Sequence, residues 1–411
     1  MRVLGASPRV IIGRDTRESS PWIEQELAHG VRVAGGRSTS AGVLPTPAIA
    51  FLTRSIGFDA GLMISASHNS YEDNGIKVFS GVGAKYAEAA EREIEALHAD
   101  RSWDVPDGKV ETVASEDYTD RYLEHAQVAL PRPGALVGLR LGIDCANGAM
   151  TTCAPRLFHR LGFDITTMAA SPDGRNINRG CGSTHPEALA AEVRTRGLRL
   201  GVAFDGDGDR AIFADQHGQI VDGDAVLLMC ARQMKAEGRL KGDAVVATVM
   251  SNIGLEIALR ASGIDLVRCA VGDKYVMEEL AARDLVLGGE QSGHIIFADQ
   301  MFTGDGLITA LNVLRTMAET GRELADLAGQ LQRYPQVLVN VEVQRRANLQ
   351  EIPGIADAMR RIEDRLGRQG RLLVRYSGTE PLLRIMLEGQ DKNTIQLWAD
   401  EIADEVRKHL A

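Results

Sequence analysis

One local pattern, repeated along the chain, limits what this sequence can fold into. It consists of an apolar run of strand length, a loop rich in Gly, Ser, Asp or Asn, and then apolar residues at helical spacing. The pattern begins three times, at residues 9–13, 139–143 and 244–249. In the first case the polar run at residues 15–20 is expected to cap the following helix. Alternating strands and helices predict an α/β fold with three related α/β domains.

The chain from residue 336 onward follows a different order and predicts a smaller C-terminal α+β domain. Residues 336–343 and 371–387 are strand-like, and a helix is expected over 355–366 with Gly367 as its C-cap. The final helix repeats apolar residues every three or four positions, so one face should pack against the rest of the domain. That face is formed by Ile395, Trp398, Ile402 and Val406.

Segments that contain proline mark the expected domain boundaries, because proline ends a preceding helix. These segments lie at residues 131–134 and 333–335. The predicted domains are residues 1–132, 133–238, 239–335 and 336–411.

The composition argues against several classes of protein. The 411 residues include 46 Lys and Arg against 56 Asp and Glu, a net charge of −10. A surface that binds nucleic acid needs clustered basic residues, and none occur, so no nucleic-acid partner is expected. The longest apolar stretches, such as residues 225–231, are far shorter than the about 18 residues of a spanning helix, so no membrane role is expected. Five cysteines without metal-ligand spacing favour a reducing, cytoplasmic setting.

The strongest local signal is the hexapeptide DGDGDR at residues 205–210, which follows a strand-like run at residues 198–204. In an extended segment alternate residues project to one side, so the carboxylates of Asp205, Asp207 and Asp209 should converge, while the intervening glycines let the backbone turn tightly around them. Three converging carboxylates repel one another unless a hard cation holds them. Mg²⁺ fits this requirement if a phosphate oxygen completes its coordination.

Two other interpretations of the hexapeptide exist. A calcium EF-hand loop also begins with alternating Asp, but its turn glycine would fall at Arg210 and its terminal Glu at Gln216, so this interpretation fails. A solvated Asp/Gly turn between two strands remains an alternative for the hexapeptide alone.

A second polar loop follows an apolar strand within residues 61–74, which read GLMISASHNSYEDN. It places Ser67 beside His68, with Lys77 shortly after. The pair suggests a nucleophile, but no G-x-S-x-G elbow is present, and a plain strand-to-helix loop is the alternative. A phosphorylated serine would carry about −1.5 to −2 charges, which suits pairing with a Mg²⁺ site.

Residues 288–294 form a glycine-flanked loop with a carboxylate, an amide, a hydroxyl and an imidazole. Sugar hydroxyls both donate and accept hydrogen bonds, so this set suits a polyhydroxylated ligand. A capped helix start explains the loop equally well. The four side chains are those of Glu290, Gln291, Ser292 and His294.

Residues 375–381, RYSGTEP, join two strand-like runs and suggest an anion site. Turn amides, two hydroxyls and a guanidinium can together surround a phosphate. A plain turn with an exposed arginine is the alternative for this segment alone. The groups belong to Arg375, Ser377, Gly378 and Thr379.

Together the four loops resemble the α-D-phosphohexomutase superfamily. They occur in the order of that family, as serine loop, metal loop, sugar loop and phosphate loop, and extend over nearly the whole chain. Residues 176–185, residues 250–256 and Gln291 resemble the branch that acts on glucosamine phosphates. The resemblance implies four domains around a central cleft, the first three sharing an α/β core.

The resemblance also implies roles for individual residues. The catalytic residues would be Ser67, as the phosphoserine, with His68 and Lys77. One Mg²⁺ per chain would be held by Ser67, Asp205, Asp207 and Asp209. Sugar hydroxyls would be bound by Glu290, Ser292 and His294. Phosphate would be bound by Arg375, Ser377, Gly378, Thr379, Arg210 and Lys274.

The implied reaction interconverts glucosamine 6-phosphate and glucosamine 1-phosphate through a bound glucosamine 1,6-bisphosphate that reorients between two phosphoryl transfers. By the resemblance, a cytoplasmic monomer or homodimer would serve the route to UDP-N-acetylglucosamine and peptidoglycan precursors. The alternatives are a mutase of glucose or mannose phosphates, a catalytically impaired paralogue that binds sugar phosphates, and a Mg²⁺-dependent phosphatase.

The sequence departs from the family before residues 9–13. Family members begin with a strand, an F-G-T-D-G-I-R-G loop and a helix, and this sequence contains none of them. The missing loop ordinarily lies near the active-site phosphate, so phosphate contacts and the first sheet are expected to be incomplete. Ser20 and Ser70 replace a glycine and a proline, and residues 37–40 are polar where an apolar strand is usual.

Overall fold

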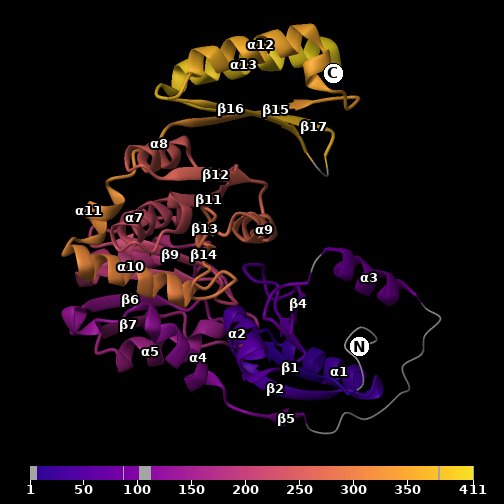
Figure 1. The fold of residues 1–411 in the computed structure, drawn as a ribbon, viewed down its shortest axis with the longest axis vertical. Coiled ribbons are helices and arrows are strands. Elements are labelled where there is room, and N and C mark those ends of the chain that lie inside the picture. Colours follow the sequence, from indigo (N-terminus) through magenta and orange to yellow (C-terminus); the bar gives the residue numbers. More distant parts are fainter. Residues whose placement is uncertain (1–6, 87, 101–112, 378–379, 411) are drawn as a thin grey trace. The chain divides into compact units, whose positions relative to one another are not determined.

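The structure is a computed structural model that describes residues 7–86, 88–100, 113–377 and 380–410. The chain divides into two compact units, coloured along the sequence in Figure 1. The first unit consists of residues 1–250 and 266–329, and the second of residues 251–265 and 330–411.

The first sheet of the first unit has the strand order β4-β3-β1-β2-β5. Its central strand β1 runs parallel to β2 and β3, and Val10, Ile11 and Ile12 are buried, as a strand covered on both faces requires. The strands are β1 (Arg9–Arg14), β2 (Arg37–Val43), β3 (Ala60–Ile64), β4 (Ile76–Ser80) and β5 (Ala114–Ser115). The helices are α1 (Ser20–Val33), α2 (Thr46–Ile56), α3 (Glu88–Ala99) and α4 (Thr119–Ala126), followed by a 3-10 turn at Gln127–Ala129.

The expected strand at residues 9–13 is confirmed, but the expected cap of the helix that follows is wrong. Ser19 precedes α1 and makes no side-chain capping bond. Its hydroxyl instead donates to Asn74 Oδ1 at 2.5 Å, which ties the start of α1 to the serine loop. The polar residues 37–40 form the first part of β2, paired with β1.

The second sheet has the order β10-β9-β8-β6-β7, and the strand expected at residues 139–143 is present as β6. All five residues of β8 are buried, and the metal loop follows this strand directly. The strands are β6 (Arg140–Asp144), β7 (Asp164–Met168), β8 (Leu200–Phe204), β9 (Ala211–Asp215) and β10 (Ile220–Val221). The helices are α5 (Ala154–Arg160) and α6 (Glu187–Arg196), with 3-10 turns at Pro133–Leu136 and Ala149–Thr151.

The third sheet has the order β12-β11-β13-β14, and β11 confirms the strand expected at residues 244–249. Its strands are β11 (Ala244–Thr248), β12 (Asp265–Cys269), β13 (Leu287–Gly289) and β14 (Ile295–Phe297). The helices of this region are α7 (Gly223–Ala236), α9 (Asp273–Arg283), α10 (Gly306–Thr320) and α11 (Leu324–Ala328), with a 3-10 turn at Lys241–Asp243. The antiparallel pair β13 and β14 presents the expected sugar loop between its strands.

The second unit contains an antiparallel sheet of order β15-β17-β16, with α12 and α13 on one face (Figure 1). The expected apolar face of the last helix is confirmed, since Ile395, Ile402 and Val406 are buried and Trp398 packs against the same core. Gly367 ends α12 at φ +53°, which favours glycine. The elements are α8 (Ile253–Ala261), β15 (Gln336–Glu342), a 3-10 turn at Leu349–Glu351, α12 (Pro353–Leu366), β16 (Arg371–Tyr376), β17 (Leu382–Glu388) and α13 (Lys392–Leu410).

Two structural observations concern the cysteines and the helices. All five cysteines are free and lie in buried positions. Within the described ranges, no helix combines the length and the apolar character needed to cross a membrane.

A buried aspartate at the start of α10 connects this helix to the metal loop. Oδ1 of Asp305 accepts hydrogen bonds from the backbone N–H groups of Leu307 at 2.9 Å and Ile308 at 3.0 Å. The Tyr122 hydroxyl lies 3.0 Å from both of its carboxylate oxygens. The next residue, Gly306, donates its N–H to the carbonyl of Gly208 at 3.0 Å. Burial raises the pKa of Asp305 to about 7.

Asp305→Asn is expected to change how stability depends on pH. The folded protein keeps Asp305 protonated up to a pKa of about 7, whereas the unfolded chain loses this proton near pH 3.8. The wild type therefore loses stability as the pH rises from about 4 to 7, by at most about 4 kcal/mol from this group. Urea unfolding at pH 5 and pH 7.5 should show a smaller loss in Asp305→Asn. An equal loss in both proteins would contradict this prediction.

Ile402→Ala is expected to destabilise the second unit by about 2–5 kcal/mol, because it leaves a cavity under α13. Leu397→Ala, on the same helix, is the matched control, since Leu397 is 69% exposed. Hydrogen exchange of β17 under native conditions measures both effects. Similar exchange rates in the two variants would argue against the packing described for α13.

Candidate active site

The loop at residues 205–210 joins β8 to β9 and gathers its three aspartates in the interior. Asp205 and Asp207 are fully buried, and Asp209 is 4% exposed. One carboxylate oxygen from each lies within 4.8 Å of the others. The carboxylates converge as expected, through a turn at the glycines rather than through an extended segment. The chain reverses direction with Gly208 in the left-handed region, at φ +76°, and the carboxylates converge for that reason.

Positive charge from outside the loop compensates the buried carboxylates. Lys77 Nζ, from β4, donates to Asp207 Oδ2 at 2.6 Å and to Asp209 Oδ2 at 2.9 Å. Burial opposes the charged form of Lys77, but the two aspartates outweigh it and raise its pKa. Burial, together with the charges of Asp209 and Asp207, raises the pKa of Asp205 well above its ordinary value. At Asp209 burial is outweighed by Lys77 and His294, which hold the pKa well below its ordinary value.

The aspartate cluster has the ligand chemistry of a divalent metal site. Among the described residues, Asp207 Oδ1 and Asp209 Oδ1 are buried and have no hydrogen-bond partner. Unpaired carboxylate oxygens in the interior are costly unless a cation or a donor meets them. Carboxylate oxygens are also the ligands that Mg²⁺ takes from proteins. The cluster therefore fits a divalent cation.

The serine loop brings a hydroxyl to this cluster. Ser67 Oγ donates to Asp205 Oδ2 at 2.6 Å, although the two residues are far apart in sequence. The backbone of Ser67 is left-handed, with φ +52°, a conformation that serine rarely adopts. The side chain of the neighbouring His68 is only partly covered. This partial burial, together with the charge of Arg210, lowers its pKa. The structure thus confirms that the serine loop and the metal loop meet.

The expected sugar loop also lies beside the metal loop. The carbonyl of Gly293 accepts a hydrogen bond from the N–H of Ala211 at 3.0 Å. Glu290 Oε1 accepts from the N–H of Gly272 at 3.0 Å, which fixes one of its carboxylate oxygens. Ser292 is exposed. The loop therefore joins the third sheet to the site formed by the first two.

His294 occupies a different environment from the rest of the sugar loop. It is 3% exposed, with Nδ1 at 3.5 Å from Asp209 Oδ1 and Nε2 at 3.9 Å from Asp273 Oδ2. Asp273 also pairs with Lys85, from the segment after β4. These contacts connect the metal loop to α9.

Two further cationic residues expected at the site, Arg210 and Lys274, belong to the first unit. The backbone N–H of Arg210 donates to Asp205 Oδ1 at 3.1 Å, and its Nε lies 4.0 Å from Asp209 Oδ1. Lys274 lies in the first turn of α9, with its Nζ 5.6 Å from the centre of the Tyr275 ring.

The expected phosphate loop belongs to the second unit, between β16 and β17. Gly378 and Thr379 lie outside the described residues. Arg375 is exposed at the end of β16, and Ser377 is 2% exposed. The carbonyl of Ser377 accepts from Arg346 Nη2 at 2.6 Å. Sequence reasoning did not identify Arg346, which lies far from the loop in sequence.

Three further residues hold the serine loop and were not identified as site residues from the sequence. Asp15 and Arg17 belong to the polar run that was expected only to cap α1. Asn178 lies within residues 176–185, which served only to distinguish one branch of a family. The polar residues of both segments were visible in the sequence, but nothing in the sequence indicated which loop their side chains contact.

Four family profiles match successive parts of the chain. They are described as phosphoglucomutase/phosphomannomutase alpha/beta/alpha domains I, II and III and the C-terminal domain of the same family. The matches span residues 1–103, 116–218, 222–334 and 338–405. The chain therefore belongs to the phosphoglucomutase/phosphomannomutase family and has its four-domain α/β architecture, as the resemblance of the four loops implied.

Individual proteins and solved structures are also similar to nearly the whole chain. Phosphoglucosamine mutase from Syntrophotalea carbinolica is 47% identical over 406 residues, which cover 98% of this chain and 89% of that protein. The structure of a phosphoglucomutase/phosphomannomutase family protein from Burkholderia thailandensis matches 99% of this chain and 90% of its own, with a TM-score of 0.77 and 24% identity. The structure of Aspergillus fumigatus N-acetylphosphoglucosamine mutase, in complex with GlcNAc-6P and magnesium, matches 97% of this chain and 82% of its own, with a TM-score of 0.67 and 19% identity.

Asp207→Asn is expected to weaken binding of Mg²⁺ or Mn²⁺ by more than about 10-fold, because an amide oxygen lacks the charge of a carboxylate. Isothermal titration calorimetry of the full chain measures this affinity. Asp243→Asn is the control, since Asp243 is exposed on a distant turn. Wild-type affinity in Asp207→Asn would show that the cluster is not the metal site.

Proposed function

We propose that this enzyme is a phosphoglucosamine mutase, which interconverts glucosamine 6-phosphate and glucosamine 1-phosphate through a phosphoserine at Ser67. The observation that carries the proposal is the 2.6 Å contact between Ser67 Oγ and Asp205 Oδ2, beside three clustered carboxylates. A nucleophilic oxygen next to a cation site is the arrangement that phosphoryl transfer needs. The name shared by the curated relatives at 43–47% identity supports the choice of substrate.

Phosphoryl transfer would proceed in two balanced steps. In the first, the bond between phosphorus and Ser67 Oγ breaks as the 1-hydroxyl oxygen of glucosamine 6-phosphate bonds to phosphorus. The proton of that hydroxyl replaces the phosphoryl group on Oγ, giving free serine and glucosamine 1,6-bisphosphate. After the bisphosphate reorients, Ser67 takes the 6-phosphoryl group by the reverse chemistry. The products are glucosamine 1-phosphate and the restored phosphoserine.

The residues around Ser67 suit these steps. Asp205, Asp207 and Asp209 would hold Mg²⁺ together with a phosphoserine oxygen, and the ion would supply charge stabilisation for the transferring group. The raised pKa of Lys77 keeps it positively charged, so it would stabilise the phosphoryl group rather than accept a proton. The lowered pKa of His68 favours the neutral ring, which can carry the proton between oxygens.

The loops farther from the reacting oxygen would bind the substrate. Glu290 and Ser292 would hold sugar hydroxyls. His294, buried between two carboxylates, would keep the metal loop and α9 aligned as well as serve the sugar loop. The phosphate that does not react would be bound by Arg375, Ser377, Gly378, Thr379, Arg210 and Lys274.

The wider context follows from the same proposal. The product would feed UDP-N-acetylglucosamine and peptidoglycan precursors, and glucosamine 1,6-bisphosphate would act as activator. A cytoplasmic monomer or homodimer is the expected form, and five free cysteines are consistent with a reducing compartment. Magnesium in the Aspergillus relative supports the choice of metal ion.

The test is turnover of glucosamine 6-phosphate by the full chain, with Mg²⁺ and the 1,6-bisphosphate, followed by ³¹P NMR. Ser67→Ala is expected to lower kcat by at least about 1,000-fold, because it removes the hydroxyl that contacts Asp205 beside the carboxylate cluster. Ser115→Ala, at an exposed serine, should match the wild type. Higher kcat/KM with glucose or mannose phosphates would favour the other activities named in the family description.

A further inference from the structure

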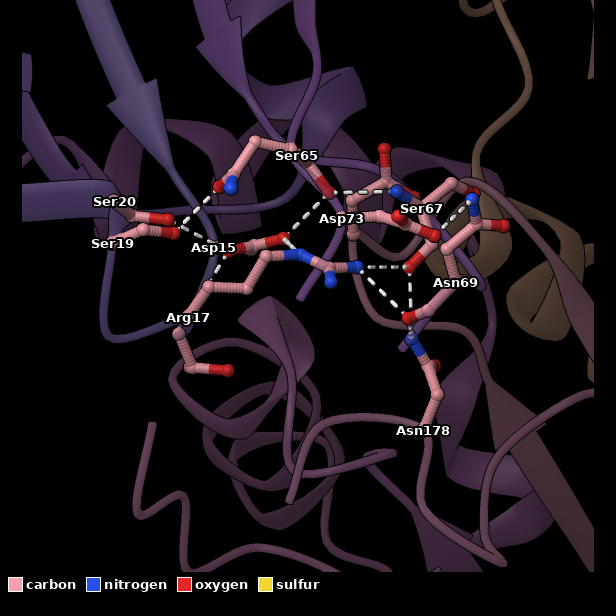
Figure 2. Close-up of polar contacts among 12 residues, drawn as sticks. Asp15, Arg17, Ser19, Ser20, Ser65, Ser67, Asn69, Asp73 and Asn178 are labelled. Carbon is pink, nitrogen blue, oxygen red and sulfur yellow. Dashed lines mark hydrogen bonds and ion pairs between the residues drawn. The ribbon is translucent and has the colours of Figure 1, made fainter. Parts of the chain in front are cut away.

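The serine loop is held by a buried arginine from the first domain. Arg17 is 1% exposed, and its Nη2 donates to the carbonyls of Ser67 at 3.2 Å and Asn69 at 3.0 Å. Its Nη1 donates to the carbonyl of Ser70. Figure 2 shows the guanidinium of Arg17, which lies just before α1, reaching the backbone oxygens of Ser67 and Asn69. One side chain therefore holds most of the backbone around the serine.

A buried carboxylate fixes this arginine in place. Asp15 Oδ2 accepts from Arg17 Nε at 2.8 Å and from the Ser65 hydroxyl at 2.7 Å. Asp15 Oδ1 accepts from the Ser20 hydroxyl at 2.9 Å. The Ser65 hydroxyl in turn accepts from the N–H of Ser67 at 2.9 Å. Both the N–H and the carbonyl of Ser67 thus belong to one hydrogen-bonded network.

The second support comes from the second domain. Asn178 Nδ2 donates to the carbonyl of Ser67 at 2.9 Å and to that of Asn69 at 3.0 Å. Both partners only accept hydrogen bonds, so the amide nitrogen has to face them. Asn178 is 7% exposed, and within the described part of the chain its Oδ1 has no hydrogen-bond partner. Among the described residues, the hydrogen bonds of this side chain therefore go to the serine loop.

Arg17 and Asn178 together saturate the same two carbonyls. Each carbonyl oxygen has two lone pairs, and each receives one hydrogen bond from the arginine and one from the asparagine. The metal loop closes the arrangement, because a Cβ on Gly206 would lie 2.6 Å from the carbonyl oxygen of Ser67 and 2.8 Å from Asn178 Nδ2. We call Arg17, Asn178 and these two carbonyls the serine-loop clamp.

We infer that Asn178 is a positioning residue that holds Ser67 in its left-handed conformation, so that Oγ points to the metal loop. Such a backbone conformation is strained for a non-glycine residue and persists only where its surroundings enforce it. Phosphoryl transfer depends on placement of the reacting oxygen to within about 1 Å. The inference rests on the proposed function for its catalytic consequence, and on the contacts above for its structural part.

Asn178 is a cleaner test of the clamp than Arg17. Removing Arg17 would leave the buried carboxylate of Asp15 without its ion-pair partner, and the fold itself would suffer. Asn178 carries no charge, and its backbone is left-handed at φ +58°, which glycine adopts without strain. Asn178→Gly therefore removes the amide and keeps the backbone. Asn178→Asp keeps the shape and replaces the donor with an acceptor.

The experiment compares full-length phosphorylated enzymes with Mg²⁺. Both variants are expected to lose kcat by about 10- to 100-fold, with KM for glucosamine 6-phosphate within about 3-fold of wild type, since the sugar loop is untouched. The kcat of Asn178→Asp should be lower than that of Asn178→Gly. Asp284→Gly is the control, because Asp284 is also left-handed, at φ +54°, but is exposed at the end of α9.

Hydrogen exchange of residues 65–70, without substrate, tests the clamp independently of turnover. Exchange is expected to be faster in both Asn178 variants and unchanged in Asp284→Gly. Wild-type exchange or wild-type kcat in either Asn178 variant would overturn the inference. Absence of turnover in the wild-type enzyme would overturn the proposed function alone, because the exchange measurement does not require it.

Discussion

Three carboxylates on one short buried turn create a concentration of negative charge, which Arg210 on the same loop offsets only in part, with its Nε 4.0 Å from Asp209 Oδ1. Further partners come from the other two domains of the first unit. Lys77 reaches Asp207 and Asp209 from an edge strand of the first sheet, and His294 approaches Asp209 from the hairpin of the third sheet. Buried charge is costly unless it is paired. The need to pair these aspartates therefore brings loops and strands from three sheets to one point.

The serine loop is fixed by a different kind of interaction. Its backbone carbonyls are neutral, and they are held by the donors of Arg17 and Asn178. Holding the loop by its backbone leaves the Ser67 hydroxyl and the aspartate oxygens available for chemistry. The charge of the site can then change during a reaction cycle while the position of the serine is maintained. The negative charge of the aspartates and the conformation of the serine loop are therefore controlled by separate groups of residues.

The parts of the fold that could be predicted are those with a local cause. Strands buried on both faces appear in the sequence as apolar runs, so β1, β6 and β11 were visible, and the apolar face of α13 follows from helical spacing. The metal loop was recognised from alternating Asp and Gly, and the glycines allowed for a tight turn. The pattern did not exclude an extended segment, since both conformations bring these side chains together. The cap at Ser19 failed because the backbone of Ser19 is already helical, at φ −77° and ψ −25°, whereas a capping residue needs an extended backbone.

The sequence by itself determined the α/β pattern, the identity of the four loops and the chemical groups each one carries, because these depend on residue type and spacing along the chain. Only the tertiary structure decided which groups meet. The Ser67 hydroxyl finds Asp205, and Asn178 finds the serine loop, through contacts more than a hundred residues apart in sequence. Such contacts depend on how the sheets pack against one another, and no local sequence pattern specifies that packing.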